Sequence, residues 1–308
     1  MSTTAAQAVA VPTTRAIGPW RQAFNRFRRR RLGVIALSIV LTFFIVGFLA
    51  KHLAPYAAED EFLKYLGHPQ PPLTAHHLLG TDAISHDFLS QLLVAIRETT
   101  IASLTCAGLT TVAGTVVGAL AGYYGGWFDA LVNWVTTVVA AVPAIAFLLI
   151  VIIWNRAPVT PMEYAYWLTA ILWIPVAHVV RATVLQLRTR EYIEAAQALG
   201  AIGPRIIIRH IIPNAGGTII VAATNVVSQV IVLVATVDYL GYGFNQYDKP
   251  TLGGLLAVAA HGLLAPGAFT ITESPWWLFV FPAVLLVLLL VSVNFAGDAL
   301  DDALNPRT

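Results

Sequence analysis

Long apolar runs, separated by shorter polar stretches, dominate the pattern of side chains along this sequence. Six of the runs continue for roughly 20 residues with almost no ionisable group, and a helix rises 1.5 Å per residue, so each could cross a hydrocarbon layer of ~30 Å. The expected spans are residues 32–50, 99–122, 130–154, 164–187, 215–240 and 276–295. Pro143 and Pro175 fall inside two of them, where spanning helices tolerate proline as a kink. The pattern predicts an all-α integral membrane protein with six transmembrane helices.

The polar stretches divide the chain around these spans. Residues 1–25 are small, polar and basic, and we expect a mobile cytoplasmic tail ahead of a transmembrane domain over residues 26–308. The first apolar run is longer than the 7–15-residue core of a signal peptide, which favours a retained anchor over a cleaved leader. Residues 51–93 and 241–275 are expected to be external loops, and residues 188–213 a cytoplasmic hairpin between the fourth and fifth spans.

Composition and charge agree with a membrane location. Of the 308 residues, 57% are hydrophobic and 11% are charged, whereas an ordinary globular domain is about one quarter charged. With six spans, most of the 18 Lys and Arg residues fall on the side of the termini and the hairpin, and few fall on the other side. Basic residues concentrate in cytoplasmic segments, so both termini should be cytoplasmic. The basic stretch FNRFRRRR directly precedes an apolar run, which favours a membrane flank over nucleic-acid binding, and the single Cys106 cannot form an intrachain disulfide.

The stretch EYIEAAQALGAIGPRIIIRHIIPN, residues 191–214, predicts two short helices at the membrane edge. Glu194 lies in the first turn of one helix, where a carboxylate suits the positive helix end. Gly200 is placed to cap that helix, and Pro204 suits the first turn of the next. Apolar residues recur at helical spacing on the first helix, and five isoleucines should bury the second: Tyr192, Ala195, Ala196 and Leu199; Ile206, Ile207, Ile208, Ile211 and Ile212. By periodicity alone, an amphipathic linker lying at the interface remains an alternative.

The spacing of this stretch resembles the EAA loop of bacterial ABC importer permeases. Glu194-Ala195-Ala196 is followed after three residues by Gly200, and after nine more by His210-Ile211-Ile212-Pro213. In that family the loop is a coupling helix that docks into a cleft on the ATPase subunit, and small alanines and a carboxylate would suit such a contact. The resemblance implies ATPase-coupling roles for Glu194, Ala195, Ala196, Gly200, Arg205, His210 and Pro213.

The resemblance extends from about residue 25 to the C-terminus and points to the C-type permeases of dipeptide and oligopeptide importers. HHLLGTDAISHDFLSQLLVAIRETT, AGYYGGWFD, ATVDYLGYG and NFAGDALDDALNPR follow the order of that family. It implies a type I ABC importer permease fold in a bacterial or archaeal inner membrane. It also implies a second permease as heterodimer partner, two ATPase subunits that bind ATP and Mg, and an external substrate-binding protein. Ser85-His86-Asp87 departs from the usual Gly-Arg-Asp, and His178 stands where an arginine is usual.

Further candidate sites lie near the expected external side. Asp238 is close to the outer end of the fifth span and is either an interfacial residue facing water or a gate or substrate contact, together with Asn225 and Gln229. The loop after this span contains an apolar segment, LGGLLAVAAHGLL, which is helical in pattern but too short to cross the bilayer. Before it lie the candidate contacts for a binding protein, Asn245, Gln246, Tyr247, Asp248 and Lys249. The alternative is a helix that only braces the sixth span.

The sequence offers no catalytic chemistry of its own. It contains no Gly-x-x-x-x-Gly-Lys-Ser/Thr phosphate loop, so we expect no catalytic site and no cofactor in this chain. His76, His77 and His86, with the nearby aspartates, could suggest a metal site, but histidines in a polar loop are more often solvated. An ion-coupled carrier is the main rival, although such carriers usually need ionisable groups inside the bilayer. Permeases of the same family for nickel, haem, glutathione or sugars remain alternatives to a di- or oligopeptide importer.

Overall fold

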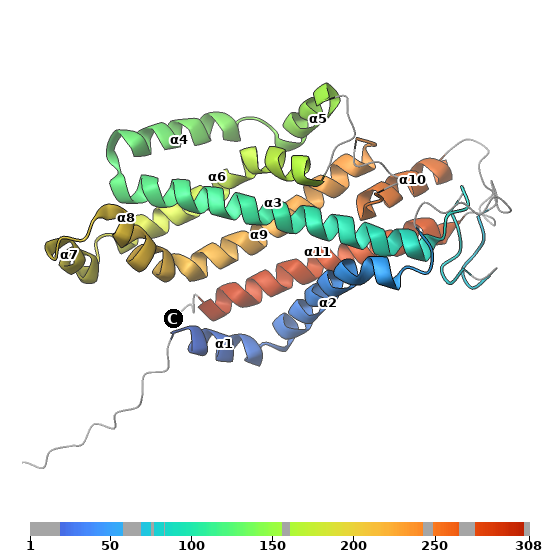
Figure 1. The fold of residues 1–308 in the computed structure, drawn as a ribbon, viewed down its shortest axis with the longest axis horizontal. Coiled ribbons are helices and arrows are strands. Elements are labelled where there is room, and N and C mark those ends of the chain that lie inside the picture. The colour runs from blue at the N-terminus through green and yellow to red at the C-terminus, as the bar shows by residue number, and fades with distance from the viewer. Residues whose placement is uncertain are drawn as a thin grey trace, which may run out of the picture.

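The structure is a computed structural model of the chain, and it describes residues 19–57, 69–74, 77–82, 84–155, 161–242, 249–264 and 275–304. Regular structure in these ranges is helical, apart from two isolated bridges that pair Thr74 with His77 and Thr81 with Asp87. Figure 1 shows long helices side by side in an elongated bundle, with α7 and α8 at one end and α10 towards the other. The predicted all-helical class is confirmed.

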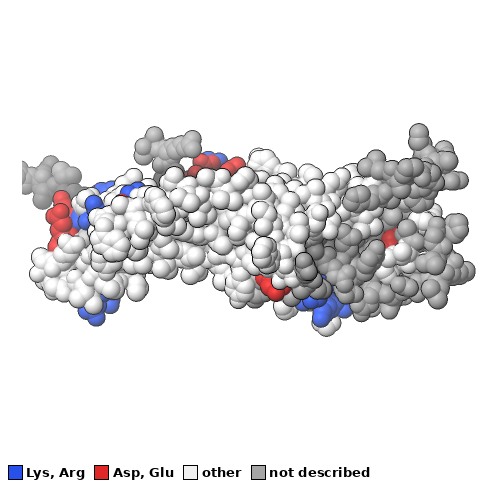
Figure 2. Space-filling model, turned by 90° about the horizontal axis from the view of Figure 1, so that it is seen from above, with Lys and Arg blue, Asp and Glu red and all other residues white. Residues whose placement is uncertain are grey.

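Five helices in the described ranges are long and apolar enough to cross a membrane, and a bent pair would make a sixth span. They are α2 (Arg31–Leu53), α3 (Phe88–Tyr124), α6 (Pro161–Leu187), α9 (Ile212–Tyr239) and α11 (Trp276–Leu304). Large apolar side chains cover their outer faces, and Phe48 on α2 is 85% exposed. On the face seen in Figure 2, charged side chains form only a few small groups on a largely uncharged surface. Such a surface suits lipid or a partner chain better than water. Five predicted spans are therefore found as single helices.

The predicted third span is the exception, because it is broken. Helix α4 (Gly126–Ala140) and helix α5 (Ala144–Asn155) meet at an angle of 76°. Pro143 lies at the break, where proline has no N–H to donate and its ring clashes with the carbonyl four residues earlier. Pro175 lies inside α6 without ending it. The difference follows from packing, because α6 is held along α3, whereas α4 buries only Thr136.

Helix α3 begins at Phe88, earlier than the predicted start of the second span at residue 99. Asp87 caps it, since its carboxylate accepts a hydrogen bond from the backbone N–H of Ser90 at 2.9 Å. The added turns bring an ion pair, Arg97 with Glu98, into the helix, and Glu98 is buried. The predicted span, residues 99–122, contains no charged residue, and the ion pair lies in the turns that precede it.

Three glycines four residues apart bring α3 and α6 into close contact. A Cβ atom on Gly118 would lie 2.4 Å from the carbonyl oxygen of Ala177, and one on Gly114 would lie 2.6 Å from the Cβ of Val176. A Cβ on Gly122 would lie 2.9 Å from the carbonyl oxygen of Arg181. Small residues at this spacing let helix backbones approach in membranes. The largest cluster of buried apolar side chains extends from this contact to α9.

Of the mobile tail expected over residues 1–25, the last part is helical from Pro19 onward, and residues 1–18 lie outside the described residues. Helix α1 (Pro19–Arg29) begins within that range, and its Ala23 and Phe27 are buried. Phe27 packs with Ala299 and Ala303 at the end of α11, and Arg30 pairs with Asp302 at 2.5 Å. The alternation of apolar and basic residues in PWRQAFNRFRR gives the helix one face to pack and one face of exposed arginines.

Helix α10 (Leu252–Leu264) is the short apolar helix that the sequence predicts. It packs between α9 and α11, with Leu252, Leu255 and Ala257 buried. A Cβ on Gly253 would lie 2.6 Å from the Cα of Ala235, so the start of α10 lies directly against the backbone of α9. The helix is thus part of the packed bundle.

Candidate functional site

The central hairpin, residues 188–213, forms a helix and a sharp turn, as predicted. Helix α7 (Glu191–Ala198) ends where Gly200 takes a φ of +81°. The N–H of Gly200 donates to the carbonyl of Gln197 at 2.9 Å, and the N–H of Ala201 donates to the carbonyl of Ala196 at 3.0 Å. This pair of bonds is a Schellman motif, which favours glycine at the residue with positive φ. Gly200 therefore has the capping role that the sequence indicates.

The second arm of the hairpin differs from the expected separate helix. Helix α8 (Gly203–Ile206), with Pro204 in its first turn, continues through the π-helical turn η2 (Ile207–Ile211) into α9, so that Gly203–Tyr239 forms one helical element of 37 residues. The π turn has a local cause in Pro213, which cannot donate a hydrogen bond. The N–H of Ile212 accordingly donates to the carbonyl of Ile207, five residues earlier. His210 and Pro213 thus lie within a continuous helix that enters the bundle.

The hairpin exposes much of the surface that the sequence singled out. Glu194, Ala195, Gly200, Arg205 and Pro213 are exposed, whereas Ala196 and His210 are half-buried. Apolar side chains are exposed beside them, and Leu199 is 89% exposed. We call the exposed apolar set the hairpin surface: Tyr192, Ala195, Leu199, Ile202 and Ile208.

Fewer isoleucines of the hairpin are buried than the sequence predicts. Ile193 and Ile206 are fully buried, and Ile207 and Ile211 are also buried. Ile208 is 67% exposed, so the expectation that all five isoleucines bury the second helix is wrong for this residue. A helix arm at the edge of a bundle has only one packed face, and Ile208 points away from it.

The hairpin is seated on the turn between α3 and α4. Arg188 donates from Nη1 to the carbonyl of Gly122 at 3.1 Å, and Gln197 donates from Nε2 to the hydroxyl of Tyr123 at 3.4 Å. A Cβ on Gly203 would lie 2.9 Å from the hydroxyl oxygen of Tyr124, so the second arm is in contact with the same turn. No pattern in the sequence connects the stretch AGYYGGWFD with the hairpin.

A partly buried ion pair holds helix α4 beside α6, close to the turn on which the hairpin rests. The carboxylate of Asp129 accepts two hydrogen bonds from the guanidinium of Arg181, and the bond from Nη2 measures 2.6 Å. The two side chains are 18% and 26% exposed. The charge distribution along the sequence indicates only a topology for Arg181 and does not predict this pair. His178, the departure from the family pattern on the same helix, is exposed.

The three candidate pathway residues of α9 do not form one site. Asn225 and Gln229 are four residues apart and both exposed, whereas Asp238 is 1% exposed and lies on the other side of the helix. Within the described ranges, the amides of Asn225 and Gln229 have no hydrogen-bond partner. A membrane-facing amide without a partner is costly, so this face suits a water-filled path or another protein chain.

Asp238 is a buried anchor, and the interpretation that it faces water is wrong. Its carboxylate accepts a hydrogen bond from the hydroxyl of Thr251, which in turn accepts one from the N–H of Gly254 at 3.0 Å. Thr251 therefore caps the start of α10 and ties it to α9. The N–H of Leu252 also donates to the hydroxyl of Thr99 on α3 at 3.2 Å. Three helices meet at this polar junction.

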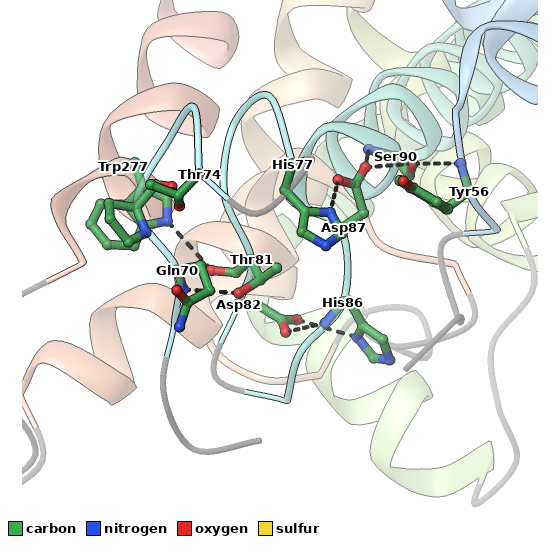
Figure 3. Close-up of polar contacts among 11 residues, drawn as sticks. Tyr56, Gln70, Thr74, His77, Thr81, Asp82, His86, Asp87, Ser90 and Trp277 are labelled. Carbon is green, nitrogen blue, oxygen red and sulfur yellow. Dashed lines mark hydrogen bonds and ion pairs between the residues drawn. The ribbon is translucent and has the colours of Figure 1, made fainter. Parts of the chain in front are cut away.

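The loop before α3 is compact where the structure describes it, and Figure 3 shows its polar contacts. His77 lies 2.8 Å from the carboxylate of Asp87, and His86 lies 3.2 Å from that of Asp82. Both histidines are 3% exposed, so the expectation of solvated histidines is wrong for these two. The indole of Trp277 reaches the carbonyl of Thr81 at 3.4 Å and connects the loop to α11. His76 lies outside the described residues.

The contacts of His86 show how the loop accommodates Ser85-His86-Asp87 in place of the usual Gly-Arg-Asp. Its imidazole pairs with Asp82, while Asp87 caps α3, so both aspartates of the loop keep a partner although arginine is absent. Ser85 is buried with a φ of +70°, and this tight backbone orients the next two side chains inward. Across the described ranges, no three His, Cys, Asp or Glu side chains form a metal-binding group.

Of the candidate contacts for a binding protein, Asn245, Gln246, Tyr247 and Asp248 lie outside the described residues. Lys249 is described and exposed, and Pro250 next to it is buried ahead of α10. This candidate contact therefore lies next to the junction of Thr251 and Asp238.

Comparison with known proteins agrees with these features. Residues 114–308 match the model of the family described as binding-protein-dependent transport system inner membrane component, and residues 18–72 match the N-terminal transmembrane domain of oligopeptide transport permease C. The chain is 34% identical over 284 residues to the oligopeptide transport system permease protein OppC of Mycobacterium bovis, covering 92% of this chain and 93% of that one.

Two other relatives are named for different substrates. The dipeptide transport system permease protein DppC of Alkalihalophilus pseudofirmus is 31% identical, with 95% of this chain and 91% of that one covered. The glutathione transport system permease protein GsiD of Pectobacterium atrosepticum is 32% identical, with 94% and 91% covered. The family match covers more than half of the chain and the relatives cover nearly all of it. The chain therefore belongs to the inner-membrane permease components of binding-protein-dependent ABC importers.

Proposed function

We propose that this chain is the C-type permease subunit of an importer for di- or oligopeptides, coupled to ATPase subunits through the hairpin. The observation that carries the coupling is the hairpin surface. Its apolar residues are exposed beside Glu194, at the end of the bundle opposite α10 (Figure 1). Exposed apolar residues rimmed by charge are typical of a protein interface.

The contacts of the hairpin support transmission of movement into the bundle. Its second arm continues into α9, and its first arm rests on the turn between α3 and α4 through Gln197 and Tyr123. A displacement of the hairpin by docked ATPases would therefore act on three helices at once. The ATPases would bind ATP and Mg and hydrolyse the nucleotide, and this chain would be the non-catalytic subunit.

A second permease has a suitable contact surface on α4 and α5. These helices bury few of their residues, and Trp127, Trp134 and Trp154 are 77%, 66% and 85% exposed. Aromatic residues are enriched at protein interfaces. The unpartnered amides of Asn225 and Gln229 would be satisfied at the path between the two permeases. Together the subunits would adopt the type I importer arrangement with cytoplasmic termini.

A substrate-binding protein would dock at the other end of the bundle. Lys249 is exposed there, next to Thr251 and the start of α10, which is tied to α9 through Asp238. Docking at this position would contact the same helix, α9, that carries the hairpin at its opposite end. Substrate selection by that partner accounts for relatives named for oligopeptides, dipeptides and glutathione.

The coupling proposal is tested by blocking the hairpin surface. Ala195→Trp places a large side chain on the exposed face of α7, and we expect loss of co-purified ATPase subunits and of ATP-driven uptake. Asn25→Trp, at an exposed position of α1, is the matched control and should leave both unchanged. Normal ATPase assembly with Ala195→Trp would contradict the proposal.

The substrate is tested separately in vesicles that contain the whole transporter and its binding protein. We expect ATP-dependent uptake of a labelled di- or oligopeptide, with other peptides competing more strongly than glutathione or nickel. Uptake of glutathione or nickel but not of peptides would retain the importer and reject the peptide substrate. Uptake driven by a proton gradient without ATP would instead favour the ion-coupled carrier.

A further inference from the structure

A groove of about 770 Å³ lies between α2 and α3, outside every site described above. Its walls are apolar along most of their length, with Leu41, Phe44 and Phe48 on α2 facing Ile101 and Leu104 on α3. Gly47 also lines it, and a Cβ there would lie 3.2 Å from the Cα of Arg97, so the two helices are in backbone contact at one side of the groove. The volume is in the range of ligand pockets.

Basic side chains lie at one end of this groove. Lys51 and His52, in the last turn of α2, and Arg97, on α3, are part of its lining. Arg97 pairs with buried Glu98, so these two charges balance. In the described part of the chain, Lys51 and His52 are exposed and have no hydrogen-bond or ion-pair partner. Among the described residues, the end of the groove thus offers the uncompensated positive charge of Lys51 and the imidazole of His52.

The length of the groove matches one leaflet of a membrane. Leu41 and Lys51 are ten residues apart on α2, a rise of about 15 Å along the helix. This is half of a ~30 Å hydrocarbon layer. An occupant with a negative group beside Lys51 would therefore place about one leaflet of apolar length against Phe48, Phe44 and Leu41.

A second groove, by contrast, has no basic end. It has a volume of about 500 Å³ and lies among α2, α3, α9 and α11, where it shares Phe44 and Leu104 with the first groove. None of its lining residues is charged. An apolar chain could enter both grooves, but only the first offers partners for an anionic headgroup.

We propose that the groove between α2 and α3 binds an anionic phospholipid. Its phosphate lies against Lys51, His52 and the exposed part of Arg97, and an acyl chain extends along the apolar walls towards Leu41. Arginine and lysine are the usual partners of phosphate, and arginine binds it in a bidentate geometry. The bound lipid would fill the contact between α2, which the N-terminal family domain contributes, and α3 of the permease core.

The experiment measures lipid retained by the full chain, co-purified with its transporter subunits from nanodiscs of equal phosphatidylglycerol and phosphatidylcholine. Native mass spectrometry should show preferential retention of phosphatidylglycerol. Lys51→Gln with His52→Gln should lower this preference about fivefold or more, since one basic residue near a membrane surface contributes about 1 kcal/mol. Lys249→Gln, also exposed but outside the groove, is the control and should leave the preference unchanged.

A filling variant tests the apolar part without changing charge. Ile101→Trp should reduce retention of both lipids while the assembled transporter keeps its size and subunit content. Equal retention of the two lipids by the unchanged chain would overturn the proposal. A cross-link from Ile101→Cys to the second permease, with no lipid retained, would show that a protein occupies the groove and would overturn it as well.

Discussion

Replacement of Gly200 tests whether the hairpin must keep one geometry in order to work. The residue has a φ of +81°, and a Cβ at this position would meet no atom within 4 Å. The cost of a side chain is therefore conformational and not steric. The left-handed region costs an ordinary residue roughly 1–2 kcal/mol, and asparagine tolerates it better. A β-branched residue such as valine is a more severe outlier there.

The expected consequence is a change in the population of the docked geometry. A loss of 1–2 kcal/mol corresponds to a factor of about 5–30 in an equilibrium. We expect Gly200→Val to lower ATP-driven uptake by about that factor, and Gly200→Asn to retain most of it, with equal amounts of both chains in the membrane. Uptake should be measured in vesicles at matched protein levels. Equal activity of the two variants would refute the argument, because it would show that the left-handed turn is not needed.

Three other predictions test contacts in the bundle, and a fourth tests the orientation of the chain in the membrane. Gly118→Ala should destabilise the protein by about 1–3 kcal/mol in thermal melts, because its Cβ would lie 2.4 Å from a carbonyl oxygen, whereas Gly108→Ala meets no atom within 4 Å and should not. Asp238→Ala should speed hydrogen exchange in α10 and lower the free energy of unfolding by about 1–3 kcal/mol. Asp238→Asn can still accept a hydrogen bond from Thr251 and should lower it less; equal losses would argue against the anchor. A double-mutant cycle of Arg181→Met with Asp129→Leu should give a coupling energy of about 1 kcal/mol, and a value near zero would exclude a role for the pair in holding α4. In a Cys106→Ala background, Lys249→Cys should react with an impermeant thiol reagent in intact cells and Gln197→Cys only after lysis; the reverse would invert the orientation.

The spans could be predicted from the sequence because hydrocarbon leaves the backbone few choices. A run such as residues 32–50 must satisfy its own hydrogen bonds, and a helix does so within the segment. The break at Pro143 could not be predicted in the same way. Pro175 has the same chemistry and lies within an unbroken helix, and the difference depends on α6 packing against α3. Hydropathy contains no information on that contact.

The hairpin turn could be predicted because Gly200 and Pro204 act locally on the backbone. The seat of the hairpin could not, because Arg188 meets Gly122, and Gln197 meets Tyr123, through helices distant in the sequence. The three glycines of α3 did carry a signal, since their four-residue spacing is typical of close helix packing. The burial of His77 and His86 had no such signal, because alternating polar residues in a loop do not show which aspartate each histidine meets.

The unbroken helical element from Gly203 to Tyr239 has a mechanical consequence. Its 37 residues measure about 55 Å end to end at 1.5 Å per residue. A rigid rod of that length moves its far end by about 1 Å for each degree that it tilts at the near end, on the same geometry. The π turn at Ile207–Ile211 lies close to the hairpin end, so 28 of the 37 residues lie beyond it. A tilt of a few degrees imposed at the hairpin is thereby amplified into a displacement of several ångströms beside Thr251.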